Sequence, residues 1–529
     1  MEISYKDSVK DNGNDNGNDN SVEIINNTPE TNFTAADRAF AFAMLACGFL
    51  YWNLINIEML GAGVTIFAAI IFAATFIYFS KSGIRQNTAS IVCLGLAGLS
   101  AARFTLFDDQ AISALNFIFL SALFIYWICL STGRRLDKDL SAYILGDAFK
   151  QGVSMPFLNF GRLPAGIKSF SKYNSLRNTL PALLGILLFL PLMIIVLKLL
   201  IQADLAFENF IGGLIDLIKI ENILIYVWEF IIGIPVALYL YGLIYGDVKG
   251  RHAEKITAAS VDRVADFIKV APKITILSVL TAFNGIYLIY FAVQAAYFFS
   301  AFGGVLPEAF TYAEYARRGF FELCTVAGIN LGVLVIAHLV LERAQGEEPK
   351  WLRIETLLIS LFTILLIVTA LSKMAMYIGA YGLTQLRIYT SWFMILLLFV
   401  FAVISIRQFI KINMTKLILI GFVSLFMILS YGNVDGVIAK YNISKYEAGT
   451  FSEFDIEMLG SLSGAAAPYV YDLYLQTDEN DAATRQQLES LILKNNPERS
   501  AGFRGFNLQQ RQANEIRAVV AESWMDIRR

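Results

Sequence analysis

The stretch YAEYARRGFFELCTVAGINLGVLVIAHLVL (Tyr312–Leu341) decides the fold class, because a polar, basic start passes directly into a long apolar run. Its apolar part, Gly319–Leu341, is long enough to cross a hydrocarbon core of about 30 Å as a helix. The sequence places Arg317 and Arg318 where this run enters the bilayer and Glu322 one helical turn further in. A charged side chain at bilayer depth costs roughly 2.5–3.5 kcal/mol, so it usually faces protein or water rather than lipid. We therefore expect a membrane-spanning helix that begins with a charge cluster.

The same apolar pattern recurs along the chain. Of its 529 residues, 56% are hydrophobic and 16% are charged, whereas soluble domains carry about 25% charged residues. Helices are expected throughout, because lipid offers backbone groups no hydrogen-bond partner. The sequence predicts an all-α, polytopic transmembrane helix bundle of about eleven spans, near Ala39–Ile57, Gly61–Ser80, Asn87–Phe107, Ala111–Ser131, Thr179–Ile201, Ile223–Tyr245, Ile274–Ser300, Gly319–Leu341, Ile354–Met376, Ile388–Ile406 and Leu417–Tyr431. A shorter run, Phe207–Ile220, reads as an interfacial or re-entrant helix.

The orientation follows from the basic residues of the loops. Loops after the even-numbered segments carry roughly five times as many Lys and Arg residues as the opposite loops, which marks them as cytoplasmic. The long loops 132–178 and 247–273 are then cytoplasmic, and the first of them either lies on the inner leaflet or packs under the bundle. We expect a multipass protein of the cell (plasma) membrane, with its N-terminus in the cytoplasm and its C-terminus outside.

Both ends of the chain are polar. Residues 1–37, with the repeat DNGNDNGNDN, are predicted to be a disordered tail, because they cannot bury enough apolar surface to fold. Residues 38–432 form the predicted transmembrane domain. Residues 433–529 contain helical patterns separated by Gly and Asn-Pro, so we expect a small helical segment outside the membrane.

Several function classes are excluded or left without support. The four cysteines lie inside apolar runs as expected buried thiols, and two histidines cannot build a histidine-rich metal site. The sequence carries no P-loop, GxGxxG, HExxH or GxSxG motif, so no catalytic residue, metal or cofactor is predicted. The expected surroundings are the lipid bilayer, with no nucleic acid and with protein partners unknown.

Charged residues near the predicted outer face are the candidate ligand-binding set. They are Arg103, Glu229, Arg317, Arg318, Glu322, Lys373 and Arg387. With Lys198 near the outer end of the fifth segment, six helices bring ionisable groups to one depth, where they would form a polar chamber with excess positive charge. Arginine there can bind a phosphate or carboxylate through two parallel hydrogen bonds. Alternatively, the Lys and Arg side chains only extend from the helix ends to the lipid headgroups, and Arg318 and Glu322 form a structural ion pair.

Small and polar residues deeper in the spans predict helix packing. Asn284 and Asn330 fall near the midplane and are interpreted as interhelical hydrogen-bonding residues. Gly95, Gly98 and Ala102 predict a close helix crossing in the third segment.

Three motifs carry a family resemblance: YAEYARRGFFEL, YGLTQLRIYT (Tyr381–Thr390) and NVDGVIAKYNISKY (Asn433–Tyr446). With them the chain resembles the bacterial multipass proteins of the domain-of-unknown-function family 4153, in particular its 4173 subset. The resemblance runs from about the fourth segment to Tyr474. It implies an integral membrane protein and transfers no catalytic residue.

Three functions remain open from the sequence. The first is an integral membrane protein that binds or translocates an anionic solute or lipid headgroup at its outer face. The second is a membrane enzyme acting on a lipid-linked phosphate, with Glu229 or Glu322 as acid or base. The third is a non-catalytic sensor or assembly factor of the cell envelope. The missing catalytic motifs favour the first over the second.

Overall fold

The computed structural model describes residues 33–137, 139–171, 220–302, 320–341, 349–450, 455–478, 480–494 and 502–527, with a few isolated positions between 196 and 207. Most of the predicted N-terminal tail, the segment Thr179–Ile201 and the run Phe207–Ile220 lie outside these residues. Arg317 and Arg318 also lie outside them.

The described elements are helical, apart from an isolated β-bridge between Ala271 and Leu341. Nine described helices are long and apolar enough to cross a membrane: Ala62–Lys81, Thr88–Leu106, Gln110–Thr132, Trp228–Lys249, Lys273–Val293, Phe320–Val340, Lys350–Tyr381, Gln385–Arg407 and Met414–Tyr431. The predicted all-α polytopic membrane fold is confirmed. The first predicted segment is helical but is not among the nine, since Asp37 and Arg38 lie in its first turn. The count of eleven spans stays a prediction.

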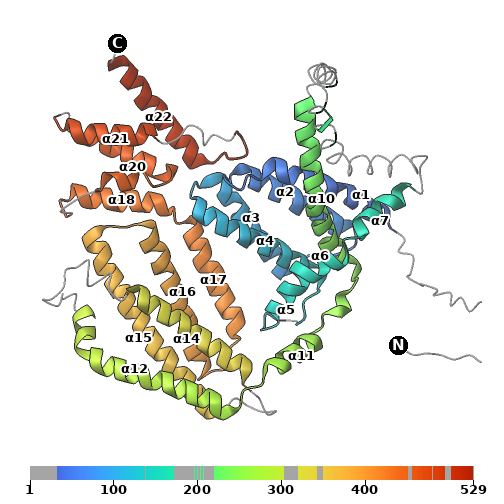
Figure 1. The fold of residues 1–529 in the computed structure, drawn as a ribbon, viewed down its shortest axis with the longest axis horizontal. Helices are drawn as coiled ribbons and strands as arrows, with labels where there is room; N and C mark the ends of the chain where they lie inside the picture. Colours follow the sequence, from blue (N-terminus) through green and yellow to red (C-terminus); the bar gives the residue numbers. More distant parts are fainter. Residues whose placement is uncertain are drawn as a thin grey trace, which may run out of the picture.

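The first bundle is built from the N-terminal part of the chain (Figure 1). Its helices are α1 (Ala35–Leu54), α2 (Ala62–Lys81), α3 (Thr88–Leu106), α4 (Gln110–Thr132) and α10 (Ile220–Lys249). Thr34 begins α1 with a capping box, in which its hydroxyl accepts from the Asp37 N–H and its own N–H donates to the Asp37 carboxylate. One core cluster joins all five helices.

Helices α1 and α10 meet backbone to backbone. A Cβ added to Gly48 would collide with the carbonyl group of Gly233, and one added to Gly233 would collide with that of Gly48. Gly95 and Gly98, in contrast, have open space beside them among the described residues. The described helices therefore do not form the close crossing predicted at Gly95 and Gly98, because small residues permit close packing without specifying which helix receives a neighbour.

Short helices lie between α4 and α10 of the first bundle, and two more lie between α10 and the second bundle. They are α5 (Ile144–Phe149), the π-helical turn η1 (Lys150–Ser154), α6 (Met155–Leu158), α7 (Arg162–Ser171), the 3₁₀ turn η2 (Ala253–Lys255) and α11 (Ala258–Ile268). Met155, Leu163 and Ile167 are buried in the first bundle's core. Of the two alternatives for the loop 132–178, its described part therefore packs against the bundle.

The second bundle contains α12 (Lys273–Phe302), α14 (Phe320–Val340), α15 (Lys350–Tyr381), α16 (Gln385–Arg407) and α17 (Met414–Tyr431). In a buried bridge, the Tyr287 hydroxyl of α12 donates to Asn330 Oδ1, and Asn330 Nδ2 donates to Thr363 Oγ1 at 2.8 Å. Asn284 of α12 donates to Glu355 of α15. Both asparagines thus make the interhelical hydrogen bonds predicted for them.

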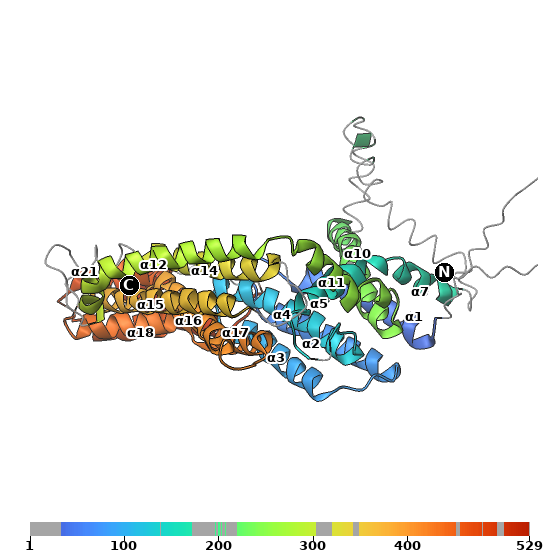
Figure 2. The ribbon, with the colours of Figure 1, turned by 90° about the horizontal axis from the view of Figure 1, so that it is seen from below.

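The C-terminal helices form a third group over one end of the second bundle (Figure 1). They are α18 (Val434–Glu447), α19 (Ile456–Leu459), η3 (Gly464–Ala466), α20 (Ala467–Gln476), α21 (Ala482–Lys494) and α22 (Leu508–Ile527). Their apolar core also takes in Ile112 of α4 and Leu429 of α17, so it is continuous with the spans. Figure 2 shows α18 and α21 at the end of the molecule opposite α1 and α7.

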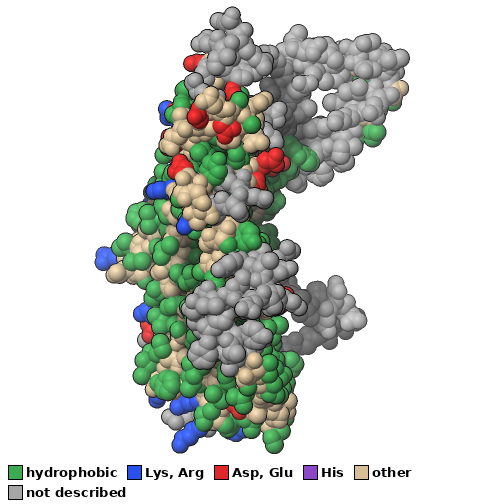
Figure 3. Space-filling view, turned by 90° about the vertical axis from the view of Figure 1, so that its left-hand side faces the viewer, with side chains coloured by type: hydrophobic (Ala, Val, Ile, Leu, Met, Phe, Trp, Pro, Cys, Tyr) green, Lys and Arg blue, Asp and Glu red, His purple; other side chains and the backbone are tan. Residues whose placement is uncertain are grey.

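One face of the molecule shows how side-chain types are distributed (Figure 3). Hydrophobic side chains predominate over its lower half, several Lys and Arg side chains lie at its lower edge and others along its left edge, and Asp and Glu side chains lie mainly in the upper part. Because this view keeps the vertical direction of Figure 1, the C-terminal helices lie at its upper end, away from the lower edge.

Candidate functional site

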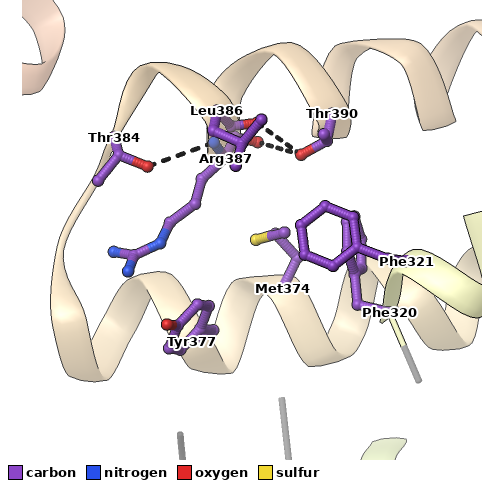
Figure 4. A pocket seen from close by; sticks show the side chains of 8 residues that line it. All are labelled: Phe320, Phe321, Met374, Tyr377, Thr384, Leu386, Arg387 and Thr390. Carbon is purple, nitrogen blue, oxygen red and sulfur yellow. Dashed lines mark hydrogen bonds between the residues drawn. The ribbon is translucent and has the colours of Figure 1, made fainter. Parts of the chain in front are cut away.

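A pocket of about 290 Å³ lies where α14, α15 and α16 meet, near the end that carries the C-terminal helices. Its lining side chains are Phe320, Phe321, Met374, Tyr377, Thr384, Leu386, Arg387 and Thr390. Figure 4 shows Arg387 extending from the start of α16 toward Tyr377 on α15, with Met374 and the two phenylalanines beside it. The pocket combines one cationic group with a largely apolar wall.

The turn between α15 and α16 positions Arg387. Gly382 ends α15 with a φ of +76°, a left-handed conformation that glycine adopts without strain. Thr384 then caps α16 by accepting the Arg387 N–H through its hydroxyl at 3.4 Å. This local sequence directs the Arg387 side chain back over the turn, so the helix start itself places the cation.

The Arg387 guanidinium is held on two sides. Its Nη1 donates to the Tyr381 carbonyl at 2.8 Å and to the Gly382 carbonyl, and its Cζ lies 4.2 Å from the centre of the Tyr377 ring. Among the described residues, nothing accepts a hydrogen bond from Nε or Nη2. Arg387 is thus oriented by protein contacts while donors of its planar fork stay available for an anion.

The apolar wall continues to the surface. Phe320 is 1% exposed and closes the interior side, whereas Phe321 is 47% exposed and Leu386 is 60% exposed. Because these helices are candidate spans, exposed apolar side chains at their ends contact lipid tails or the headgroup boundary. The pocket can therefore take a molecule with a charged end and an apolar end.

Two further predicted residues adjoin the pocket. Glu322 follows Phe321 in the first turn of α14, and Lys373 precedes Met374 on α15. Lys373 is half-buried, and the Glu322 carboxylate lies within electrostatic range of it. The structure therefore brings Glu322, Lys373 and Arg387 to one end of the second bundle. The predicted Arg318–Glu322 pair and the role of Arg317 lie outside the described residues and stay predictions.

Arg103 lies elsewhere, in a fully protein-bonded setting. It is 1% exposed, and its guanidinium donates to the Ser430 carbonyl at 2.9 Å, the Ser113 hydroxyl at 2.7 Å and the Asp109 carbonyl at 3.5 Å. These contacts tie α3 to the start of α4 and the end of α17. Arg103 lines a different, water-sized cavity of about 10 Å³. The structure does not bring it into the Arg387 pocket.

Glu229 also lies apart from the pocket, in the first bundle. One of its carboxylate oxygens accepts a hydrogen bond from Asn53 Nδ2 at 2.8 Å, which links α10 to α1. The single chamber expected from the depth of these charges is thus divided among separate places. Depth along a helix is visible in the sequence, but the direction a helix face points is not.

Sequence reasoning missed the buried carboxylates Asp108 and Asp435, which bond to the C-terminal helices. Asp435 accepts from Gln385 Nε2 at 2.7 Å and from the Ser463 N–H at 2.9 Å. Asp108 accepts from the Gly464 N–H and from Asn507 Nδ2, both at 3.0 Å. We call Asp108, Asp435 and their partners the docking junction, because they attach the C-terminal helices to the membrane domain. The only signal for it was Asp435 within NVDGVIAKYNISKY.

The Asp109 carboxylate connects the two regions. It accepts from the Tyr389 hydroxyl at 2.7 Å, two residues beyond Arg387 on α16, and its other oxygen caps α4 by accepting the Ile112 N–H at 3.0 Å. The start of α16 is therefore bonded both to the first bundle and, through Gln385, to the C-terminal helices.

The comparison with protein families identifies the chain. The model of the family described as Domain of unknown function (DUF4153) matches residues 91–473, well over half of the sequence. The chain belongs to the DUF4153 family. The DUF4153 match covers the described helices α4 to α18, includes the Arg387 pocket and ends within α20. No curated protein and no solved structure matches the chain.

The side chains that line the pocket supply one cation together with hydroxyl groups. Among its lining side chains, Arg387 is the one charged group, and the threonine hydroxyls and the tyrosine provide polar contacts. In the part of the chain that the structure describes, no three His, Cys, Asp or Glu residues gather as metal ligands.

Proposed function

We propose that this protein binds an anionic amphiphile, such as a lipid with an anionic headgroup, in the pocket between α14, α15 and α16. The observation that carries the proposal is the Arg387 guanidinium, which is held over Tyr377 beside an apolar wall. The anionic group would pair with Nε and Nη2 of Arg387, and the apolar part would lie against Phe321 and Leu386. Translocation of the bound molecule is a further step of the same proposal.

The physical argument rests on geometry and on charge. The Arg387 guanidinium is already oriented by protein contacts, so it loses little conformational freedom when it binds an anion. Lys373 adds positive charge nearby, although Glu322 offsets part of it. A volume of about 290 Å³ is near the lower end of small-molecule sites, so it suits a headgroup rather than a whole lipid. By the loop charge bias, this end of the bundle faces outward from the cell membrane.

A thermal-shift experiment on the purified full chain tests the proposal. Phosphatidylglycerol should raise the melting temperature, with zwitterionic phosphatidylcholine giving a much smaller effect and inorganic phosphate reporting on the headgroup alone. Ligand binding to the folded state adds about 2.7 kcal/mol of stability at a hundredfold excess over Kd. A response to phosphate as large as that to phosphatidylglycerol would identify a free anion as the ligand.

The variant Arg387→Lys keeps the charge but loses the planar fork, so its response should fall. Arg407→Lys, the same substitution at the opposite end of α16, should respond like the parent chain. The proposal is overturned if no anion shifts the melting temperature of the parent. It is also overturned if Arg387→Lys responds as the parent does.

A further inference from the structure

The opposite end of the second bundle holds a carboxylate that has no basic partner among the described residues. Glu355 lies near the start of α15, and α12 supplies its hydrogen-bond donors. Thr281 Oγ1 donates to Glu355 Oε1 at 2.8 Å, and Asn284 Nδ2 donates to Glu355 Oε2 at 2.5 Å. The Asn284 amide also reaches the Glu355 carbonyl at 3.3 Å. Both carboxylate oxygens of Glu355 thus accept hydrogen bonds from neutral side chains of α12.

Neutral donors do not cancel the charge of Glu355. Among the described residues, no Lys, Arg or His forms an ion pair with this carboxylate. Its two donors, Thr281 and Asn284, lie on the candidate span Lys273–Val293, and Glu355 itself lies on the candidate span Lys350–Tyr381. A carboxylate at membrane depth is costly unless a positive charge accompanies it. The arrangement therefore calls for a compensating cation.

Unpartnered oxygen atoms form a second, independent observation. Asn284 is 8% exposed, and its Oδ1 is buried without a hydrogen-bond partner. Thr356, the residue after Glu355, is 1% exposed, and its Oγ1 is also buried without a partner. An amide carbonyl can be satisfied only by a donor or a cation. A carboxylate, an amide oxygen and hydroxyls are the hard oxygen ligands that small alkali and alkaline-earth cations prefer.

We propose that Glu355, Asn284 and Thr281 form a binding site for one small monovalent cation at the α12–α15 contact. A single carboxylate matches one positive charge, which favours a monovalent over a divalent ion. The site lies 22 residues from Tyr377 along α15, about 33 Å at the rise of an α-helix, and is separate from the Arg387 pocket. It does not depend on the anion proposal.

Sodium is the probe for this site. The melting temperature of the purified full chain is measured in sodium chloride against N-methylglucamine chloride, at equal ionic strength and fixed pH. Sodium should raise the melting temperature with a saturable dose dependence, and Glu355→Gln, which is nearly isosteric, should abolish the rise. Glu447→Gln, an exposed substitution on α18, is the matched control and should keep it.

A second variant keeps the test decisive if Glu355→Gln does not fold. Thr281→Val removes one oxygen at an exposed position and should raise the half-saturating sodium concentration roughly fivefold, the equivalent of about 1 kcal/mol. The proposal is overturned if sodium leaves the melting temperature of the parent unchanged. An unshifted sodium midpoint in Thr281→Val also overturns it.

Discussion

Two arginines at similar predicted depths have opposite surroundings. Arg103 is buried, and each of its three guanidinium nitrogens donates a hydrogen bond to a protein acceptor. Arg387 lies on a pocket wall, and within the described part of the chain only its Nη1 donates, to two backbone carbonyls. Both are arginines near a helix end, so the sequence assigned them the same role. The difference arises because three separate elements converge on Arg103, and no local pattern in the chain encodes that convergence.

Replacing Arg103 with Lys should therefore lower the stability of the folded protein whether or not a ligand is bound. Lysine cannot span three acceptors, and each lost hydrogen bond to a charged group costs about 1.5–3 kcal/mol. We expect the melting temperature of Arg103→Lys in detergent to fall clearly, while Arg407→Lys stays near the parent value. An Arg103→Lys protein as stable as the parent would show that these contacts do not hold the bundles together.

At the scale of helices, hydropathy predicted where helices occur better than it predicted where they begin and end or which helices pack together. The predicted segment Ile354–Met376 is the core of α15, which extends over Lys350–Tyr381. The extra turns carry charged and aromatic residues that a hydropathy window excludes but that a helix end tolerates at the membrane boundary. The pocket could not be predicted in the same way, because Phe321, Met374 and Leu386 meet only through the rotation of three helices about their axes.

The docking junction makes a prediction about the C-terminal helices. In the parent, one Asp435 oxygen accepts from Gln385 Nε2 and the other from the Ser463 N–H. In Asp435→Asn one of these oxygens becomes an NH₂ donor, so one of the two hydrogen bonds is replaced by a contact between two donors. The combined variant Asp108→Asn/Asp435→Asn should loosen the region 434–527 from the membrane domain. Hydrogen exchange should then rise in α18, α20 and α22 while the protection of α15 is retained.

Asp472→Asn is the control for this experiment, because Asp472 is exposed on α20 of the same helical group. It should leave hydrogen exchange as in the parent. Equal exchange in the combined variant and the parent would mean that the apolar core shared with Ile112 and Leu429 holds the C-terminal helices without the carboxylates.

At the scale of the whole molecule, charge and apolar surface divide the chain into three levels. The lower edge in Figure 3 carries several Lys and Arg side chains, hydrophobic side chains predominate above it, and the C-terminal helices and the nearby Arg387 pocket lie toward the opposite end. The positive-inside rule, applied to the loops, predicts the orientation in which the pocket faces outside and the Glu355 site lies near the cytoplasm. The proposed ligands thus depend on the topology, since each site would face a different solution.

Fusions of alkaline phosphatase, which is active only outside the cytoplasm, test this orientation. A fusion after Arg529 should be active, whereas fusions after Gly83 and after Lys150 should be inactive, because both positions precede or lie in loops rich in basic residues. Immunoblotting of each fusion controls for expression. If the fusion after Lys150 is active and the fusion after Arg529 is inactive, the orientation in the membrane is the reverse of the predicted one. The Arg387 pocket would then face the cytoplasm, and its anionic ligand would have to come from the inner leaflet.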